Sequence, residues 1–426
     1  PREWTNVHRG GYYTKPMRLK LVKTNNRAYL EEMKSWSMPA VYETVNAIQN
    51  TKWRINAGVF NVMREVWERG GSTGGLPPRD NLPMPANAPA GATEEMIKDT
   101  KRRKAEVHVE NMRLSSKRIA MASKLWVAEK FQDAEAIYFV HNLDWRGRAY
   151  ALSSYVNPQG DDSGRALLEF GTGVKLGTNG AFWLAVHGAN CFGIDKGSFE
   201  ERAQWVYDNT VAILDSGLQP LEGKRFWTEA DGGKKAYSFL AFCQEWLRLH
   251  MHTTAGHAQE DFVSYLPVSW DGTCNGLQNY SMMMRDEVGG KATNLLPSDK
   301  PSDIYAEVAK VADIRTRWEA EHCGDTTAAG WLGKIDRTIA KRPTMTLPYG
   351  AGKFGMKDQL LDTLKKIEDK TRKQYLDGDK FKACLYMADV MYDSIGQVVS
   401  AARVAMDWLQ AVAKVAASGG LPIMWD

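Results

Sequence analysis

The sequence has little of several features that would each point to one class of protein. Among its 426 residues, no apolar run approaches the ~20 that a membrane-spanning helix needs, and no signal peptide opens the chain. The net charge is only +4 at pH 7, so a nucleic-acid partner has to be argued from clustered charge rather than from composition. We therefore expect a soluble protein that makes no membrane contact.

Cysteine and clustered metal ligands are scarce as well. The five cysteines stand at positions 191, 243, 274, 323 and 384. An odd number without C-x-x-C spacing favours free thiols in a reducing compartment over a disulfide framework or a zinc site. His250, His252, His257 and Asp261 suggest a metal site by their spacing, but their loop-like surroundings supply no cysteine. We interpret them as a surface cluster.

What is present is an ordinary globular composition on a long chain. Apolar residues make up 43% and charged residues 25%, and 426 residues exceed the usual size of one domain. We expect two or three packed subdomains. The chain begins at Pro1 without an initiator methionine and stops with the strand-like apolar run 421–426, so we expect both ends to be cut from a longer polypeptide.

The segment 337–350, RTIAKRPTMTLPYG, carries the strongest chemical pattern. Arg337, Lys341, Met345 and Tyr349 follow one another at intervals of four, which puts them on one face of a helix. Two cations beside a flexible apolar side chain and a hydroxylated ring suit a nucleoside triphosphate, with the cations at the phosphates and the others at base and sugar. The alternative is a solvated basic helix that carries a tyrosine.

A second segment places one carboxylate where a metal ion is easily held. Asp271 follows a strand-like apolar run from Phe262 to Trp270. It precedes Gly272, whose lack of a side chain allows close approach to the backbone. A carboxylate in this setting predicts a site for a metal ion that prefers oxygen ligands.

Four motifs in these and neighbouring segments resemble one enzyme family. W-D-G-T-C-N-G-L-Q-N at 270–279 and R-x3-K-R-x6-Y-G at 337–350 resemble the first metal-carboxylate motif and the nucleotide-binding helix of the single-subunit RNA polymerases of bacteriophages and mitochondria. D-W-R-G-R at 144–148 and R-D-E-V-G-G-K-A at 285–292 resemble the same family, most closely its phage members. The four motifs occur in the family's order, and the resemblance extends over essentially the whole chain.

The resemblance implies a mixed α/β, helix-rich right-hand fold of thumb, palm and fingers in which the palm is incomplete. The segments would be a remnant of an amino-terminal region at 1–36, the thumb at 37–136 with an exposed loop at 70–93, the first part of the palm at 137–299 and the first part of the fingers at 300–426. Apolar periodicity predicts one long helix over 37–69, capped by Ser37, whereas 1–36 is expected to be irregular.

The implied activity is template-directed RNA synthesis from ribonucleoside triphosphates on a DNA template, by nucleotidyl transfer with two Mg²⁺ ions. By the resemblance, Asp271 would bridge both metals and the carbonyl of Gly272 would add an oxygen ligand. Lys341 would balance charge at the α-phosphate and protonate the leaving pyrophosphate. Arg337 and Arg342 would hold the β- and γ-phosphates.

The same motifs imply how base and sugar are held. Tyr349 would close the site beneath them, with Met345 and Gly350 beside it. Related DNA polymerases carry a glutamate five residues after the first catalytic aspartate, where it blocks the ribose 2′-hydroxyl. That position is Gly276 here, so ribonucleotides should fit.

Nucleic-acid contacts are predicted first on a basic helix. The helical pattern at 94–131 carries nine basic residues against three acidic ones between 101 and 130, and Lys101, Arg102 and Arg103 lie at its start. A helix with this excess suits a phosphate backbone, because each neutralised phosphate releases a counterion. The alternative is a solvated charged face.

A second contact is predicted at a hairpin. The segment 137–156 reads as two strands around a polar turn that would project Arg146 and Arg148 together. The resemblance favours their contact with the template strand or the RNA–DNA hybrid, whereas the alternative is local pairing with Asp144. It also places Tyr305 near the template, on a helix capped by Ser302 and Asp303.

Two departures from the family's pattern stand out. Pro343 and Pro348 fall inside the expected helix, where we expect a kink. The family's second catalytic aspartate, in a His-Asp-Ser motif, is missing. The nearest string is Tyr392-Asp393-Ser394, but it lies in a helical pattern, and we reject Asp393 as the second metal ligand. The isolated chain is therefore expected to be inactive.

These implications define the expected partners and two alternatives. The complete enzyme would be a monomer that acts on a DNA template, nascent RNA and ribonucleoside triphosphates in the cytoplasm of an infected bacterial host. One alternative is a DNA polymerase of the related family, disfavoured by Gly276 and by the motif at 144–148. The other is a non-catalytic nucleic-acid-binding piece, if the chain is a separate polypeptide.

Overall fold

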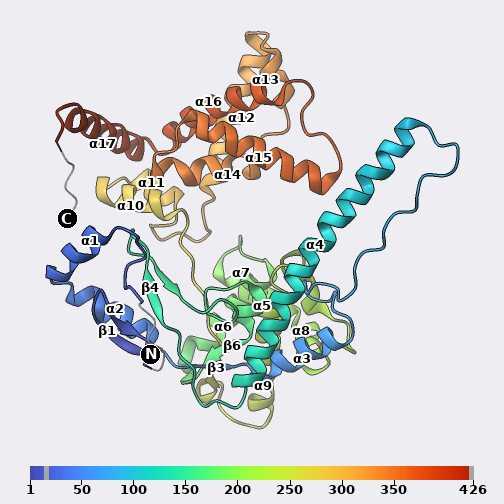
Figure 1. Ribbon diagram of the computed structural model, residues 1–426. Helices are drawn as coiled ribbons and strands as arrows, with labels where there is room; N and C mark the ends of the chain where they lie inside the picture. The colour runs from blue at the N-terminus through green and yellow to red at the C-terminus, as the bar shows by residue number, and fades with distance from the viewer. Residues whose placement is uncertain (14–18, 422–426) are drawn as a thin grey trace. The chain divides into compact units, whose positions relative to one another are not determined.

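The computed structural model of the chain describes residues 1–13 and 19–421, which form two compact units that meet between Ser269 and Trp270 (Figure 1). Helices dominate both units and short two-stranded sheets occur in the first, so the expected helix-rich, mixed α/β class is confirmed. The boundary falls inside the segment predicted as palm, and the assignment to thumb, palm and fingers stays a prediction. Within the described ranges, every helix is too short or too polar to cross a membrane.

The amino-terminal part of the first unit is organised around Trp4. Its elements are β1 (Arg2–Asn6), β2 (Arg9–Gly11), α1 (Arg27–Glu32) and the 3-10 turn η1 (Met33–Ser35). The two strands form an antiparallel hairpin. Trp4 is buried, and its indole nitrogen donates to the carbonyl oxygen of His141 at 3.0 Å. The expectation that 1–36 is irregular is therefore wrong, because a contact to a distant strand holds this segment.

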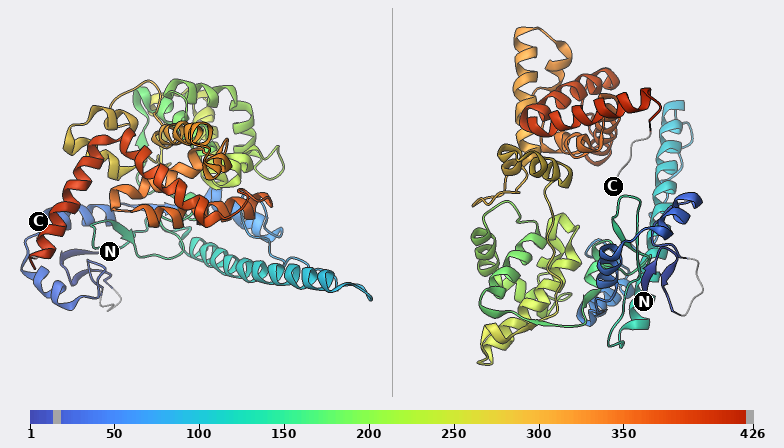
Figure 2. Two further views of the ribbon diagram at one scale, coloured as in Figure 1. Left: turned by 90° about the horizontal axis from the view of Figure 1, so that it is seen from above. Right: turned by 90° about the vertical axis from the view of Figure 1, so that its left-hand side faces the viewer.

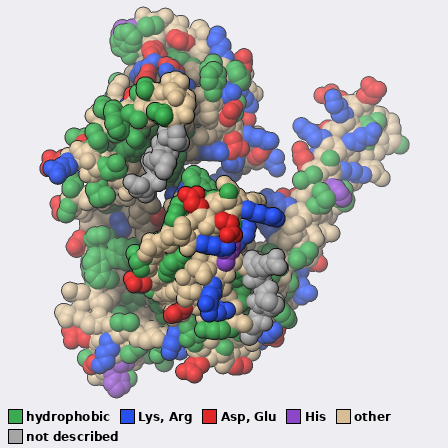
Figure 3. Space-filling view, turned by 60° about the vertical axis from the view of Figure 1, so that its left-hand side comes forward, with side chains coloured by type: hydrophobic (Ala, Val, Ile, Leu, Met, Phe, Trp, Pro, Cys, Tyr) green, Lys and Arg blue, Asp and Glu red, His purple; other side chains and the backbone are tan. Residues whose placement is uncertain are grey.

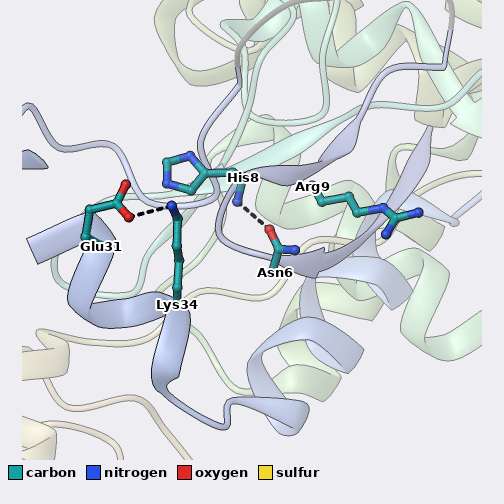
Figure 4. Close-up of a pocket in the computed structure, with 5 residues that line it drawn as sticks. All are labelled: Asn6, His8, Arg9, Glu31 and Lys34. Atoms are coloured by element: carbon teal, nitrogen blue, oxygen red, sulfur yellow. Dashed lines mark hydrogen bonds and ion pairs between the residues drawn. The ribbon is translucent and has the colours of Figure 1, made fainter.

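An open pocket lies beside this hairpin and is lined by Asn6, His8, Arg9, Glu31 and Lys34 (Figure 4). Lys34 pairs with Glu31 at 2.5 Å, and the backbone N–H of His8 donates to the Asn6 side chain at 2.9 Å. Arg9 extends away from the other four side chains. The pocket thus satisfies its own charges or directs them outward, and nothing in it points to a ligand.

The long helix predicted over 37–69 is wrong, because the segment is divided into three elements. They are α2 (Pro39–Gln49), β3 (Trp53–Ile55) and α3 (Ala57–Glu68). Trp53 exchanges two backbone hydrogen bonds with Ile137, at 3.0 and 2.7 Å, and this pairing draws the middle of the segment into a strand. The residue that precedes the first turn of α2 is Met38 rather than Ser37.

Helix α4 (Glu94–Phe131), capped by Thr93, and the loop 70–93 both match their predictions. The loop contains no helix or strand, and it runs alongside α4. The Asn111 side chain exchanges two hydrogen bonds with the backbone of Leu82, at 2.7 and 3.0 Å. The amino-terminal end of α4 projects from the rest of its unit in each view (Figure 1 and Figure 2).

The rest of the first unit packs around α9. The predicted hairpin is present as β4 (His141–Leu143) and β5 (Ala149–Ala151). The later elements are α5 (Asp162–Ala166), β6 (Leu168–Phe170), β7 (Val174–Lys175), α6 (Gly177–Phe192), α7 (Phe199–Asp208), α8 (Thr210–Leu218), η2 (Phe226–Gly233), α9 (Ala236–Thr254), η3 (Gln259–Asp261) and β8 (Val263–Ser264). Strand β3 pairs with β6, and β7 with β8. Phe239 and Phe242 on α9 are fully buried in this core.

Two predictions near the end of this unit have clear outcomes. The strand-like run expected from Phe262 to Trp270 is reduced to the two residues of β8, so Asp271 follows an irregular segment instead of a strand. His250 and His257 are exposed, as interpreted, but His250 and His252 lie on α9, so the surroundings expected to be loop-like are helical up to Thr254. The rings of His252 and His257 stack at 4.8 Å, and among the described residues no three side chains are grouped so as to hold a metal ion.

The second unit is built from helices throughout its described part. They are α10 (Asn275–Met284), α11 (Glu287–Ala292), α12 (Ile304–His322), α13 (Thr326–Trp331), α14 (Arg337–Thr346), the 3-10 turn η4 (Leu347–Tyr349), α15 (Lys353–Thr371), α16 (Lys380–Val398) and α17 (Ser400–Ser418). Their core includes Trp331, whose indole nitrogen donates to the carbonyl oxygen of Ala383 at 3.1 Å. The long packed helices predicted after 376 are confirmed. The strand-like run expected at 421–426 lies outside the described residues except for Leu421.

Candidate active site

The residues predicted to handle a nucleotide and a metal ion all belong to the second unit. They are Asp271, Gly272, Gly276, Arg337, Lys341, Arg342, Met345, Tyr349 and Gly350. The first two lie in the exposed loop before α10, and the third lies in the first turn of that helix. The next four lie on α14, and the last two end the turn η4 that follows it. One compact unit therefore contains both predicted motifs.

Helix α14 has a defined start, a buried face and an early end. Asp336 caps it by accepting the backbone N–H of Ile339 at 3.1 Å. Pro343 lies on the buried face, and the helix passes through it without interruption. The α-helix then gives way to the 3-10 turn in which Pro348 occupies an early position. The expected helix thus stops short of Tyr349, and the second proline accompanies the change of helix type.

Two cations of α14 lie over one aromatic ring. The guanidinium carbon of Arg337 is 5.1 Å from the centre of the Tyr305 ring, and Nζ of Lys341 is 5.9 Å from it. The Nε of Arg337 also donates to Asp303 at 2.6 Å, and this aspartate caps α12. A ring and a carboxylate from a neighbouring helix thus hold two positive charges side by side, as a polyphosphate requires.

Tyr305 itself is a core residue, only 6% exposed. Its hydroxyl and the thiol of Cys274 are hydrogen-bonded. Burial raises the pKa of Tyr305 to about 12 and also raises the pKa of the Cys274 thiol, so neither group carries charge at neutral pH. The observed role of the ring is to support the two cations. Its contact with the template stays a prediction.

Arg342 is directed to a different neighbour. It pairs at 2.5 Å with Asp362 on α15, and Lys366 shares that carboxylate at 2.8 Å. The hydrogen bonds from Lys366 and Arg342 lower the pKa of Asp362. A phosphate that binds Arg342 has to compete with Asp362, just as one that binds Arg337 has to compete with Asp303.

Gly276 lies against the turn that carries Tyr349. A Cβ atom at position 276 would lie 2.6 Å from Cβ of Pro348 and 3.9 Å from Cζ of Tyr349. Tyr349 is 61% exposed, and Gly350 ends its turn with a φ of 84°, which favours glycine. Met345 is exposed one turn earlier. The glycine at 276 therefore has a packing reason that is separate from the predicted clearance for a 2′-hydroxyl.

The exposed loop before α10 offers oxygen ligands for a metal ion, namely the Asp271 carboxylate and the Gly272 carbonyl. Mg²⁺ usually keeps several waters and is bound through one or two carboxylates together with substrate phosphates, so this pair fits such an ion. No larger ligand group occurs in the described part of the chain. Asp393 lies on α16, as predicted, and accepts from Nη1 of Arg315 at 2.8 Å.

The two arginines of the predicted hairpin contact are in the first unit. The Asp144 side chain accepts the backbone N–H groups of Arg146 and Arg148, at 2.9 and 3.0 Å. It also accepts the Arg146 guanidinium at 2.9 Å, which is the local pairing that the sequence left open. The neighbouring Trp145 is 74% exposed. The turn thus presents a cation and a large ring, and their contact with nucleic acid stays a prediction.

The basic start of α4 is partly neutralised within the helix. Arg102 and Arg103 pair with Asp99, at 2.6 and 2.9 Å, whereas Lys101 next to them is exposed. Both basic and acidic side chains are visible on the projecting arm (Figure 3). The charge count from the sequence began at 101 and therefore missed Asp99.

Sequence reasoning also missed the residues that hold the cations of α14. Asp303 was predicted from the sequence as a helix cap. Its ion pair with Arg337 was not, because that residue lies 34 positions further along the chain. Asp362 gave no signal at all, since it lies in an ordinary charged helix. The apolar contact of Pro348 with Gly276 joins two motifs whose relation only the fold reveals.

Known proteins match this chain along its whole length. A family model described as DNA-dependent RNA polymerase matches residues 174–421. T7 RNA polymerase of Escherichia phage T7 is 35% identical over 448 residues, which cover 98% of this chain and 49% of that protein. The mitochondrial DNA-directed RNA polymerase 1B of Nicotiana tabacum is 36% identical over 441 residues, which cover 100% of this chain and 42% of that protein.

A third relative, the mitochondrial DNA-directed RNA polymerase 1 of Arabidopsis thaliana, is 32% identical over 438 residues. The chain spans about half the length, or less, of these curated relatives. The family model nevertheless covers more than half of the chain, including the loop of Asp271 and helix α14. The chain belongs to the DNA-dependent RNA polymerase family.

Proposed function

We propose that the chain takes part in template-directed RNA synthesis, in which ribonucleoside triphosphates are joined on a DNA template by two-metal nucleotidyl transfer. The observation that carries the proposal is the pair of cations, Arg337 and Lys341, held over the Tyr305 ring in the same unit as Asp271. The relatives are named as RNA polymerases, and the plant mitochondrial ones as DNA-directed RNA polymerases, which supports the reaction class.

In the proposed mechanism the chain's own residues bind and orient the triphosphate. Arg337, fixed by Asp303, takes the terminal phosphates. Lys341 lies at the α-phosphate and gives a proton to the leaving pyrophosphate. Asp271 and the Gly272 carbonyl would hold Mg²⁺. When bound, the two ions supply activation of the primer 3′-hydroxyl and stabilisation of the pyrophosphate charge.

Sugar selection is assigned to Tyr349, whose ring is exposed beside Gly276. By the resemblance, glycine at 276 would leave a 2′-hydroxyl unobstructed, but selection also needs a polar group that a deoxynucleotide leaves unsatisfied, a loss of about 1–3 kcal/mol. Tyr349→Phe should therefore keep turnover with ribonucleotides and improve deoxynucleotides roughly tenfold or more. The measurement is kcat/KM for one ribo- and deoxynucleotide pair, and an unchanged ratio would make Tyr349 a packing residue.

The same proposal includes the nucleic-acid partners. Helix α4 and the hairpin turn at Arg146 and Arg148 would contact the DNA template and the nascent RNA through their exposed cations and rings. The complete enzyme would act as a monomer in the cytoplasm of an infected bacterial host. The phage relatives support that host, and the plant mitochondrial relatives show that the family also works elsewhere.

A non-catalytic nucleic-acid-binding role is the second candidate. It is favoured by one observation: within the described ranges, no three or more His, Cys, Asp or Glu side chains form a group that could hold a metal ion. Sequencing the encoding DNA beyond codon 426 separates the two. An open frame that carries a His-Asp-Ser motif supports the enzyme, and a stop codon supports the binding role.

Asp271→Asn, made in the polypeptide as its gene encodes it, is the direct test of the site. The change removes the charge proposed to hold the metal and should therefore cost several kcal/mol of transition-state stabilisation. The rate of RNA synthesis should fall roughly a hundredfold or more, while nucleic-acid binding stays intact. Asp299→Asn is the matched control, because it removes another exposed carboxylate of the same unit. Retention of more than about a tenth of the turnover contradicts the assignment.

A further inference from the structure

Asn294 occupies an unusual position between the two motifs of the second unit. Its backbone is left-handed, with a φ of 58°, although it is not a glycine. Its side-chain amide nitrogen donates to Oγ1 of Thr273 at 3.0 Å and to the carbonyl oxygen of Ser302 at 2.8 Å. Its amide oxygen accepts the backbone N–H of Ser302 at 2.7 Å. One half-buried side chain thus joins two segments that are far apart in sequence.

Each joined segment continues directly into a residue of the proposed site. Thr273 is two positions from Asp271, the proposed metal ligand. Ser302 precedes Asp303, which binds Arg337 at 2.6 Å and caps the helix that carries Tyr305. The Asn294 side chain thus links Thr273 to Ser302, and the next residue, Asp303, bonds to Arg337, the proposed phosphate-binding cation.

We propose that Asn294 is a positioning residue that sets the distance between the metal loop at Asp271 and the phosphate-binding cation Arg337. The proposal rests on the proposed function, since it assigns Asn294 to that same site. Metal and phosphate groups have to be held in register for nucleotidyl transfer, and a misplacement of about 1 Å costs on the order of a hundredfold in rate. The Asn294 side chain bonds to Thr273 and Ser302, so it would act on the metal and the phosphates through these neighbours.

Asparagine suits this position for two physical reasons. It tolerates the left-handed backbone better than most residues, because its short polar side chain bonds locally. Its amide also offers donors and an acceptor in one plane, which the two groups of Ser302 and the hydroxyl of Thr273 require. Aspartate would keep the acceptor and lose both donated hydrogen bonds.

The segment around Asn294 is anchored independently of this amide. The buried Thr293 hydroxyl donates to the carbonyl oxygen of Gly289 at 2.7 Å, and the Gln278 side chain donates to the carbonyl oxygen of Thr293 at 2.8 Å. Replacing the Asn294 side chain should therefore loosen its two partners without unfolding the loop. Asn294→Gly is the appropriate change, because glycine keeps the left-handed backbone.

The first test is kinetic and uses the polypeptide as its gene encodes it. Asn294→Gly should lower kcat roughly tenfold to a hundredfold and raise the Mg²⁺ concentration needed for half-maximal rate. Thr273→Val cuts only the link to the metal loop, so it should raise the Mg²⁺ requirement and leave KM for the nucleotide unchanged. Combining the two changes should add little to Asn294→Gly alone. A purely structural role would reduce active protein while leaving Mg²⁺ requirement and KM unchanged, and that result overturns the proposal.

Ser298→Ala is the matched control, since it removes a different side-chain hydrogen bond of the same loop, from Ser298 to the Lys300 carbonyl oxygen at 2.8 Å. A second readout is independent of activity. Hydrogen exchange should become faster in peptides that cover 270–275 and 300–305 in Asn294→Gly, but not in Ser298→Ala. Unchanged exchange in both peptides overturns the proposal. If the wild-type chain makes no RNA but Asn294→Gly still exchanges faster in these peptides, the structural link through Asn294 is supported. That result counts against the proposed function only.

Discussion

Helices α4 and α14 are both basic, but they hold their charges in opposite ways. The start of α4 balances its own cations, since Arg102 and Arg103 both pair with Asp99 on the same helix. The cations of α14 are held by other elements, because Tyr305 and Asp303 belong to α12 and its cap. The first arrangement follows from spacing along one helix, whereas the second exists only in the folded unit.

The comparison distinguishes two kinds of phosphate binding. On α4 binding would depend on the amount of positive charge, whereas on α14 it would depend on where each charge is held. Side chains that pair within one exposed helix are mobile and screened, so they can follow a phosphate backbone of any sequence. A guanidinium with a fixed carboxylate on one side and a ring beneath it presents its remaining donors in one direction. Single substitutions should therefore matter greatly on α14 and little on α4.

The strongest test of this contrast is Lys341→Gln, which removes one positioned charge. We expect kcat for RNA synthesis to fall on the order of a hundredfold, because the lost interaction is made to charge that develops on the leaving group. Lys365→Gln, at an exposed position of α15, is the control and should retain wild-type rates. Comparable rates for the two variants would mean that α14 is only a charged surface.

Gly276→Ala tests whether α10, through Gly276, sets the position of the turn η4 that follows α14. The added methyl group would meet Pro348 at 2.6 Å, so the turn that carries Tyr349 has to shift. We expect the preference for ribonucleotides over deoxynucleotides to fall roughly tenfold. The double variant Gly276→Ala with Pro348→Gly removes the opposing ring and should recover part of that preference. No recovery would show that the loss has another cause.

Tyr305→Leu removes the ring that supports both cations. Cation–π contacts contribute about 0.5–2 kcal/mol, so KM for nucleotides should rise several-fold to about thirtyfold. Tyr305→Phe keeps the ring and removes only the hydrogen bond with the Cys274 thiol, and its KM should stay near that of the wild type. Equal effects of the two changes would assign the role to the hydroxyl instead of the ring.

The smallest effects are expected on α4. Replacing Lys101, Arg102, Arg103 and Lys104 by Gln should flatten the plot of log K against log salt, by ~0.7–0.9 for each phosphate that the helix no longer neutralises. Asp99→Asn releases the two arginines from their internal partner and should make the slope steeper instead. Nucleic-acid affinity at several salt concentrations provides the measurement. An unchanged slope in both variants leaves α4 as solvated surface.

The sequence predicted the elements whose determinants are local. Helix α4 carries its own cap and charge pattern, and the hairpin β4–β5 carries its own polar turn, so both appear as expected. The division of the segment 37–69 into α2, β3 and α3 could not be predicted from local sequence. Its apolar spacing fits a helix, but Trp53 bonds to Ile137, and a tertiary partner overrides helical propensity.

The candidate site shows the same limit. Spacing placed Arg337 and Lys341 on one helix, and motif content placed Asp271 in a predicted metal-binding loop, so the residues of the candidate site could be named from the sequence. The residues proposed to orient them are an ordinary cap residue, Asp303, and an ordinary loop residue, Asn294. Their partners, Arg337 and Thr273, lie 34 and 21 positions away. The spacing of residues along the sequence gives no sign of such distant pairs.

The short strand β3 has a consequence for synthesis on the ribosome. The side chain of Arg54 bonds to Glu169, 115 residues later, and Trp53 packs against Phe170 on the same strand. At roughly 5–20 residues per second, translation needs on the order of ten seconds to deliver those partners. During that interval the apolar face of α3, buried in the finished unit, is exposed as the chain emerges. The nascent chain thus exposes an apolar segment that the folded unit conceals.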